Sequence, residues 1–345
     1  MTLKELGWND FFEESWQAKF GSNDVVPGRV FKTHRGFYTV WSESGKVEAP
    51  ARGKLIRDPA TRPVTGDWVA LEVDPPTVRG TLSRRTQVVR KAPGEETVSQ
   101  VLGANIDTIF IVAGLDRDFN PRRIERFLVI AFESGAQPVV VLNKSDVCPD
   151  AAARVAEIEE IAHGAPVFLT SAYLNQGIDT LRSQLKPGDT AGFMGSSGVG
   201  KSHLINCLLG TDERAVGAVR ESDGRGRHTT VGRDLLLAED GWLLMDLPGV
   251  RAVEPWSAKG VDQTFTDIEE LIAQCRFRDC SHGSEPGCAV ASALASGSLD
   301  KERYENYLKV QEDLKKLSKR QKEKESIDSQ RSREAARRTP RRKRR

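Results

Sequence analysis

The sequence predicts a multidomain chain: a small β-barrel, then a doubly wound α/β domain, then a small and mainly helical domain. Three observations support this order. Strand patterns separated by turn residues occupy residues 25–95, strand and helix patterns alternate from Ile106 onward, and three cysteines gather near residue 280. With 345 residues, each domain can bury its own core. The predicted boundaries are an N-terminal arm at 1–24, the barrel at 25–95, the α/β domain at 96–257, the cysteine-containing helical domain at 258–318 and a basic tail at 319–345.

The charge is distributed unevenly along the chain. The formal net charge is only +2, yet residues 319–345 carry 13 Lys and Arg against 4 Asp and Glu, so the rest of the chain is acidic. The tail has almost no apolar residues for a core, and we therefore predict that it is disordered when free. On an acidic protein this arm would supply most of the contacts with a polyanion such as nucleic acid. The alternative is a solvated tail that only aids solubility.

The hydropathy pattern predicts a protein without a membrane segment. No run approaches the roughly 20 consecutive apolar residues that span a bilayer. Residues 1–16 carry acids instead of a basic leader and an apolar run, so we expect no secretory signal and a cytoplasmic location. A short amphipathic helix or docking arm is indicated there by Leu3, Leu6, Phe11, Phe12 and Trp16.

Residues 25–95 have the pattern of an all-β unit. Predicted strands include 28–31, 37–41 and 67–73, and about five such strands suit a small closed barrel, most simply an OB-fold. Basic and aromatic side chains on such a barrel would bind single-stranded nucleic acid through backbone charge and base stacking. A structural barrel with ordinary surface charge is the alternative. The side chains concerned are Arg29, Lys32, His34, Arg35, Arg52, Lys54, Arg57, Phe31, Phe37 and Tyr38.

Buried parallel strands alternate with helices from Ile106 onward. Residues 106–112 and 138–142 are continuous apolar runs, as in strands covered on both faces, and residues 121–133 between them have helical spacing. Each polar motif described below follows a predicted strand, at the edge where doubly wound sheets bind their ligands. Further predicted elements are helices at 150–162 and 178–185 and strands at 166–169, 190–194, 234–237 and 242–245.

A glycine-rich segment with the pattern Gly-x-x-x-x-Gly-Lys-Ser follows the strand at 190–194. Glycines let its backbone curl so that the N–H groups point at phosphate oxygens, and the next helix adds its positive end. Lys201 would neutralise the β- and γ-phosphates of a nucleotide, and Ser202 would hold Mg²⁺. The predicted phosphate loop consists of Gly195, Ser196, Ser197, Gly198, Val199, Gly200, Lys201 and Ser202.

A second motif, Asn143-Lys144-Ser145-Asp146, predicts guanine as the base. The Asp146 carboxylate can accept both the N1–H and N2–H₂ donors of guanine, whereas adenine would leave it unpaired at a cost of about 1–3 kcal/mol or more. Lys144 can lie over the base, and Ser171-Ala172 matches a weaker motif whose backbone N–H contacts guanine O6. In an ordinary GTPase the phosphate loop precedes the Asn-Lys-x-Asp segment. Here it follows, so we predict a circularly permuted GTPase domain.

A third motif, Asp246-Leu247-Pro248-Gly249, fits the Mg²⁺ side of such a site. Asp246 would reach the metal through water, and the Gly249 N–H would contact the γ-phosphate. Ras-like enzymes place next the Gln that orients the attacking water, but this chain has Val250, which leaves His228 of a glycine-rich loop as the candidate. Either Thr230 or Thr229 would contact Mg²⁺ and γ-phosphate. The predicted catalytic residues are therefore His228, Lys201 and Thr230, and the predicted Mg²⁺ ligands are Ser202, Thr230 and Asp246.

Four potential metal ligands, Cys275, Cys280, His282 and Cys288, fall within one short segment. Three thiolates and one imidazole complete a tetrahedral zinc shell with no open position, so we predict one structural Zn²⁺. Disulfides are the alternative, but a chain without a signal peptide is expected in a reducing compartment. Cys148 and Cys207 lie apart, in the α/β domain, and are predicted to be inert.

Over residues 25 to about 310 these motifs together resemble the ribosome small-subunit-dependent GTPase A family (RsgA, also called YjeQ or YloQ). The resemblance includes Gly226-Arg227-His228-Thr229-Thr230 and the run from Cys280 through Glu285-Pro286-Gly287 to Cys288. It implies an OB-fold, a circularly permuted P-loop GTPase and a zinc domain acting late in maturation of the small ribosomal subunit. Two departures are His203, where a second Ser is usual, and Leu247, where Thr is common.

The resemblance also implies partners and turnover. The expected partners are GTP or GDP and the small ribosomal subunit with its rRNA, and the expected chain is a monomer that hydrolyses GTP slowly alone and faster on the subunit. It would bind the subunit with GTP and leave after hydrolysis. The competing function is a GTP-gated rRNA-binding protein in which turnover is incidental. A third, an ATP-using RNA remodelling enzyme, is disfavoured by Asp146.

Overall fold

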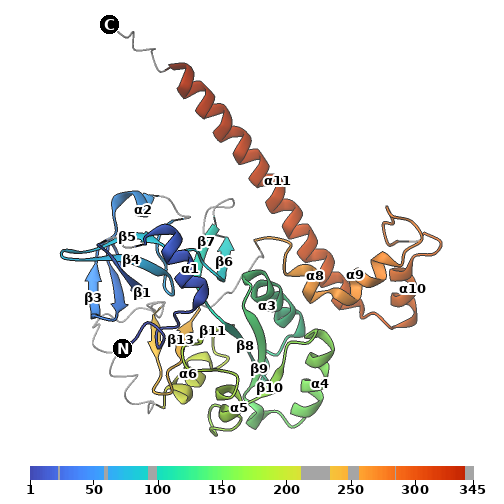
Figure 1. Ribbon diagram of the computed structural model, residues 1–345. Helices are drawn as coiled ribbons and strands as arrows, with labels where there is room; N and C mark the ends of the chain where they lie inside the picture. Colours follow the sequence, from blue (N-terminus) through green and yellow to red (C-terminus); the bar gives the residue numbers. More distant parts are fainter. Residues whose placement is uncertain are drawn as a thin grey trace.

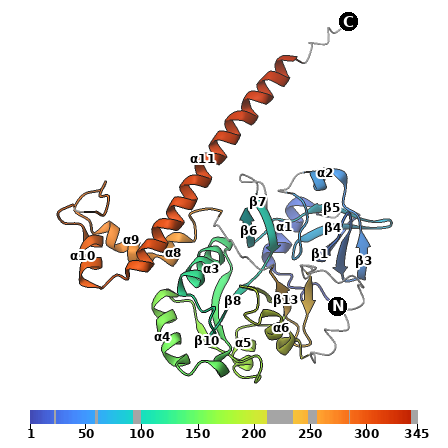
Figure 2. The ribbon, with the colours of Figure 1, turned by 180° about the vertical axis from the view of Figure 1, so that it is seen from behind.

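The computed structural model describes residues 1–21, 24–57, 61–91, 99–210, 234–247, 256–283 and 285–338 (Figure 1). The N-terminal strands lie on one side of the central α/β domain and the short C-terminal helices lie on the other. Figure 2 shows from behind that one long helix projects away from this body. Within the described part of the chain, no helix combines the length and the apolar character that crossing a membrane requires.

Five antiparallel strands form the N-terminal barrel, in the order β3-β2-β1-β4-β5. An isolated parallel bridge between Ala51 and Val78 joins the two ends of this order, because Val78 N donates to Pro50 O over 2.8 Å. This connectivity is that of an OB-fold and confirms the predicted fold class for this part. The elements are β1 (Val26–Thr33), β2 (Tyr38–Ser42), β3 (Gly45–Ala49), α2 (Gly53–Arg57), β4 (Trp68–Val73) and β5 (Pro76–Thr81).

The N-terminal helix packs onto the barrel. α1 (Asp10–Lys19) buries Phe12 and Trp16, and the rings of Phe12 and Trp8 lie 5.8 Å and 4.7 Å from that of Trp68 at the start of β4. Aromatic pairs at these separations add about 0.5–1.5 kcal/mol each beyond their burial. The predicted amphipathic helix is therefore present, and it belongs to the hydrophobic core beside the barrel.

The prediction that these barrel side chains bind nucleic acid is wrong for some of them. Arg29 is only 1% exposed, and it donates to Leu6 O, to Asn105 O over 3.0 Å and to Thr190 Oγ1 over 2.8 Å. Phe31 and Tyr38 are also buried, whereas Phe37 is half exposed. Arg29 and Phe31 lie on the face of β1 that packs against the segments beside the barrel, whereas Tyr38 lies in the barrel's own core, so these three side chains are not available to a nucleic acid.

A hairpin connects the barrel to the α/β domain. β6 (Gln87–Lys91) pairs antiparallel with β7 (Ser99–Ala104), so the predicted boundary between residues 95 and 96 falls between two strands of one unit. Thr86 fixes the base of this hairpin, because its hydroxyl donates to Ile106 O over 2.6 Å.

The central sheet has the order β10-β9-β8-β11-β13-β12, and only β12 runs antiparallel to its neighbour. Helices α3 and α4 cover one face and α5 and α6 the other, as expected for a doubly wound domain. The phosphate-loop strand β11 lies in the middle of the sheet, although it comes fourth among the sheet strands along the chain. The elements are β8 (Thr108–Gly114), α3 (Pro121–Ser134), β9 (Gln137–Asn143), the 3₁₀ turn η1 (Ser145–Val147), α4 (Ala151–Ile161), β10 (Val167–Leu169), α5 (Ile178–Arg182), β11 (Thr190–Gly195), α6 (Lys201–Leu209), β12 (Leu235–Leu237) and β13 (Leu243–Asp246).

The C-terminal helices share a separate apolar core. Phe265, Ile268, Val290 and Val310 are fully buried in it, and Val129 of α3 joins them from the α/β domain. The helices are α8 (Val261–Thr264), α9 (Thr266–Ala273), α10 (Ala289–Ser296) and α11 (Lys301–Arg338).

The prediction of a disordered tail is wrong for residues 319–338, which continue α11 as far as Arg338. Tyr307, Val310, Leu314 and Leu317 anchor the first part of the helix in apolar surroundings. Beyond Leu317 the sequence is rich in Lys, Arg, Glu, Gln and Ala, which propagate a helix readily once it has been nucleated. Helical propensity, rather than a core, thus explains the extension into solvent.

Candidate functional site

The phosphate loop joins β11 to α6 and needs its glycines. Gly195, Gly198 and Gly200 have φ angles of 155°, 82° and 101°. A Cβ atom on Gly195 would lie 2.2 Å from Val112 O, and one on Gly200 would lie 2.2 Å from Asn143 Nδ2. The loop is therefore shaped both by positive φ angles and by close approach to the strands beside it.

Lys201 opens α6 and lies back over the loop. Its ammonium donates to Gly195 O over 2.9 Å and to Ser196 O over 2.7 Å. Burial lowers the pKa of Lys201 from its ordinary value, and the charge of Asp246 partly opposes this shift. Asp246, at the end of β13, thus lies within electrostatic reach of the phosphate loop, and Ser202 follows Lys201 in the first turn of α6.

Asn143 joins three segments at the end of β9. Its Nδ2 donates to Val199 O over 2.9 Å, while its Oδ1 accepts from Ala172 N over 3.0 Å and from Thr170 Oγ1 over 3.2 Å. The residue is 2% exposed. Asn143 therefore braces the phosphate loop against the Ser171-Ala172 loop, and its side-chain hydrogen bonds go to protein.

Asp146 and Ser171 form the predicted base-reading corner. Ser171 is fully buried, and its hydroxyl donates to Asp146 Oδ1 over 2.5 Å and accepts from Leu174 N over 3.1 Å. Asp146 itself is exposed. One carboxylate oxygen is thus held in place by Ser171 at an accessible edge, which is the arrangement that recognition of two adjacent N–H donors requires.

Asp116 is a member of this site that sequence reasoning missed. Its Oδ2 accepts from Lys144 Nζ over 2.6 Å, and this hydrogen bond lowers the pKa of Asp116 below its ordinary value. Lys144 has a left-handed backbone, with φ 66°. The position of Asp116 just after β8 could have revealed it, because every other motif also follows a parallel strand at this edge of the sheet.

The structure brings together most of the predicted nucleotide residues, from the ends of β9, β10, β11 and β13. The hydroxyl of Ser202 and the carboxylate of Asp246 are hard oxygen donors, so the residues present suit Mg²⁺. The other predicted members of the site, His228, Thr229, Thr230 and Gly249, lie outside the described residues.

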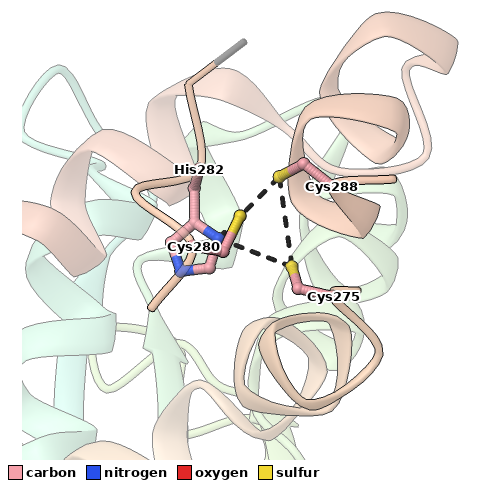
Figure 3. A group of neighbouring side chains, drawn as sticks. All are labelled: Cys275, Cys280, His282 and Cys288. Carbon is pink, nitrogen blue, oxygen red and sulfur yellow. Dashed lines mark hydrogen bonds between the residues drawn. The ribbon is translucent and has the colours of Figure 1, made fainter. Parts of the chain in front are cut away.

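The cysteine–histidine cluster closes a four-ligand shell between α9 and α10 (Figure 3). The ligand atoms of Cys275, Cys280, His282 and Cys288 all lie within 4.8 Å of one another. The Sγ atoms of Cys275 and Cys288 are 4.0 Å apart, and they lie 3.6 Å and 3.8 Å from His282 Nδ1. Tetrahedral zinc with bonds of about 2.0–2.3 Å places ligand atoms about 3.5–3.8 Å apart, so the cluster fits Zn²⁺.

Three features shape the loop that carries these ligands. His282 has φ 60° and Cys288 is the N-cap of α10, where its sulfur accepts from Ala291 N. Glu285 accepts from Ser281 N over 3.0 Å and from Gly283 N over 2.9 Å. Hydrogen bonds, the first of them from the Ser281 hydroxyl, lower the pKa of Glu285 to about 2. Glu285 therefore orders the turn between the second and fourth ligands.

Comparison with known proteins gives a consistent result. Among models of protein families, the RsgA GTPase family matches residues 81–256 and the RsgA N-terminal domain matches residues 27–78. The family of 50S ribosome-binding GTPases matches residues 190–325. The small ribosomal subunit biogenesis GTPase RsgA of Opitutus terrae is 44% identical and covers 90% of this chain and 89% of its own. That of Xanthomonas axonopodis pv. citri is also 44% identical, covering 90% of this chain and 87% of its own.

Two crystal structures have the same fold. YjeQ from Thermotoga maritima matches with a TM-score of 0.62 at 28% identity, covering 84% of this chain and 98% of its own. YloQ, described as a circularly permuted GTPase, matches with a TM-score of 0.56 at 23% identity, covering 85% of this chain and 96% of its own.

Proposed function

The chain belongs to the RsgA GTPase family, and from this premise we propose that it assists late maturation of the small ribosomal subunit. It is a GTP hydrolase with a circularly permuted nucleotide domain. In the proposed cycle it binds the subunit with GTP, the subunit stimulates hydrolysis, and the GDP form leaves. The relatives named for small-subunit biogenesis support the subunit as partner, and the bracing of the phosphate loop against the base-reading corner by Asn143 supports the nucleotide site.

Guanine selection is assigned to Asp146 and its neighbours. The carboxylate of Asp146, oriented by Ser171, would accept the N1–H and N2–H₂ donors of the base. The Ala172 N–H already donates to Asn143, so contact with guanine O6 would need a shared hydrogen bond at that position. Lys144, held by Asp116, would lay its stem along one face of the base.

Phosphate binding is assigned to the loop and to Lys201. On nucleotide binding, the ammonium of Lys201 would exchange its two loop carbonyl partners for β- and γ-phosphate oxygens. Ser202, Asp246 and Thr230 would hold Mg²⁺, which neutralises phosphate charge when bound. His228 would position the attacking water, because Val250 cannot. Zinc in the Cys₃His shell would have a structural role, because four protein ligands leave no open position.

The stimulation experiment tests the proposed turnover. GTP hydrolysis by the full chain should be faster with purified small subunits than without them. His228→Ala should keep GTP affinity and lose the stimulated rate, because its interaction is made mainly in the transition state, whereas Lys201→Ala should lose nucleotide affinity as well. Equal rates with and without subunits would favour the GTP-gated rRNA-binding protein. If small subunits stimulate GTP hydrolysis by His228→Ala as strongly as by the wild type, another group must position the attacking water.

The base experiment tests the site itself. Asp146→Asn should weaken GTP and favour a xanthine nucleotide, whose additional oxygen accepts a hydrogen bond from the amide. Asp150→Asn, an exposed carboxylate before α4, is the matched control and should bind GTP as the wild type does. Equal affinity of the wild type for ATP and GTP would contradict the assignment of Asp146.

A further inference from the structure

A cavity of about 770 Å³ lies beside the phosphate loop, on the side of α3 and α11. Its walls are formed by the phosphate loop, by the segment leading into α3, by the first turns of α3 and by α11. Lys144, Asp146, Ser171, Lys201 and Ser202, which serve the proposed nucleotide site, do not line it. Asp116 and four residues of the phosphate loop, Ser196 to Val199, do line it, so the cavity borders the nucleotide site and extends from it toward α3 and α11.

The basic side chains of this cavity come from two elements. α3 contributes Arg122, Arg123 and Arg126, and α11 contributes Lys309. Two acids, Asp116 and Asp118, also line the cavity, but they pair with Lys144 and Arg123 over 2.6 Å each. The three arginines also have acidic partners, which are Glu125 and Asp300 for Arg122, Asp118 for Arg123 and Asp313 for Arg126. Lys309 is thus the cation of the lining that has no ion pair among the described residues.

Two of these cations retain hydrogen-bonding capacity. The Nε atom of Arg126 is buried without a hydrogen-bond partner among the described residues, although its Nη2 donates to Asp313 over 2.8 Å. Lys309 is exposed and forms no ion pair with any residue that the structure describes. An orphaned buried donor is costly, so the Arg126 guanidinium would gain from turning an N–H toward an acceptor in the cavity that it lines.

The start of α3 adds the positive end of a helix to these arginines, of which Arg122 also pairs with the buried Glu125 and with Asp300. A helix N-terminus favours acids, yet the first turn of α3 contains no acid and carries Arg122 and Arg123. Arg123 also donates to Ser196 Oγ over 3.0 Å, so this turn is bonded directly to the phosphate loop. Cations, helix end and loop thus converge on one space.

We propose that this cavity is a second phosphate-binding site, which holds one phosphate group between α3, α11 and the outer wall of the phosphate loop. Guanidinium and ammonium groups are the side chains that recognise phosphate most directly. Two sources supply this chemistry: a backbone phosphate of RNA, which rests on the proposed function, and inorganic phosphate, the product of GTP hydrolysis. In both cases the site would connect α11 with the nucleotide loop through Arg123.

The test uses the full chain loaded with Mg²⁺ and GDP, so that the nucleotide site is occupied. One arm titrates inorganic phosphate by calorimetry, and the other titrates a short fluorescein-labelled oligouridine by anisotropy. Lys309→Gln should weaken binding roughly fivefold and lower the slope of log K against log[salt] for the oligonucleotide by about 0.7, the value for one contact with a single strand. Arg126→Gln provides a second, independent cation to remove.

Lys301→Gln on the same helix is the matched control, because Lys301 is exposed and lies outside the cavity. Weaker oligouridine binding by both cavity variants supports an RNA source, and weaker phosphate binding alone supports the reaction product. Wild-type affinity of both variants for both probes would overturn the proposal. Stimulation by small subunits is measured separately. Its absence in the wild type would count against the proposed function and would leave the phosphate titration unchanged.

Discussion

The α/β domain meets the barrel and the C-terminal helices in different ways, although a buried arginine stands at each interface. Arg29 on the barrel side is 1% exposed and Arg303 on the helical side is 4% exposed. Each guanidinium also lies over an aromatic ring, Trp68 at 5.6 Å and Phe265 at 5.0 Å. The two residues differ in the acceptors that surround them.

Arg29 is surrounded by neutral acceptors. It bonds to two backbone carbonyls and one hydroxyl, and its Nε has no partner among the described residues. Burial lowers the pKa of Arg29 to about 9, and the nearby Arg85 charge adds to that effect. The guanidinium of Arg29 therefore joins the N-terminal segment, the barrel and the α/β domain through hydrogen bonds. This contact has a free-energy cost, because a buried charge loses its hydration.

Arg303 is surrounded by carboxylates. It donates to Glu125 Oε1 over 2.6 Å and to both oxygens of Asp267, over 2.9 Å and 2.8 Å. Burial opposes its charge, but these hydrogen bonds and ion pairs outweigh that effect and raise the pKa of Arg303. Burial of an arginine thus has no fixed meaning. The acceptors decide whether the cation costs stability or anchors a network.

Loss of the metal should produce the largest difference in stability between the C-terminal helices and the barrel. Cys280→Ser should remove amide-exchange protection from residues 256–300 and leave the barrel protected, because a structural zinc site contributes on the order of 10 kcal/mol of binding free energy. Hydrogen exchange with mass spectrometry measures both regions in one experiment, and elemental analysis should find one zinc per wild-type chain. Cys148→Ser, outside the cluster, is the control. A wild type purified without chelator and lacking zinc would contradict the predicted metal.

Arg303→Met should destabilise the protein more than a change at Arg29. Glu125 is fully buried, and losing Arg303 leaves it with Arg122 and Asn306 as its hydrogen-bond partners among the described residues. We expect a loss of about 3 kcal/mol in the free energy of unfolding, the lower end for a broken buried pair, because Arg122 still supplies a charge. Urea unfolding followed by tryptophan fluorescence measures this. A loss below that of Arg29→Met would reverse the comparison.

Arg29→Met should cost less, about 1–2 kcal/mol. The change leaves the carbonyls of Leu6 and Asn105 without this donor, but it also removes a cation that burial disfavours. The same urea titration applies, with Arg35→Met on the exposed surface of the barrel as the control. A loss as large as that of Arg303→Met would show that neutral acceptors hold a buried guanidinium as firmly as carboxylates do.

The smallest expected effect is the loss of folding stability at acidic pH. Burial alone would raise the pKa of Asp267, but hydrogen bonds from His163 and Arg303 outweigh it and lower the pKa well below the ordinary value. The stability contributed by Asp267 is therefore complete above an unfolded pKa of about 4 and is lost as pH falls through the folded pKa. The pKa of Arg29 lies near 9, so acid leaves its contribution unchanged.

Urea unfolding between neutral pH and about pH 3 tests this sign. Asp267→Asn should show a shallower loss of stability with acid than the wild type, and Asp262→Asn, an exposed acid on α8, should follow the wild type. Parallel curves for Asp267→Asn and the wild type would assign the acid sensitivity to other carboxylates.

The sequence by itself determined the motifs and the elements that carry them. Helix α3 was predicted at 121–133 and spans Pro121–Ser134, and the strand predicted at 138–142 lies within β9 (Gln137–Asn143). Apolar periodicity, the Asn120 cap and glycine spacing are local signals, so a short window of sequence contains them. The inverted order of the two nucleotide motifs, and with it the circular permutation, is equally a property of the linear chain.

Only the tertiary structure decided which polar residues are partners. Arg29 has the same local setting as an exposed strand residue, yet it meets Asn105 and Thr190 far along the chain, just as Arg303 meets Glu125. The pairing of Asp116 with Lys144 also depends on two strands lying side by side. Burial and hydrogen bonding between distant segments arise from the packing of whole elements, and no local pattern of residue types encodes that packing.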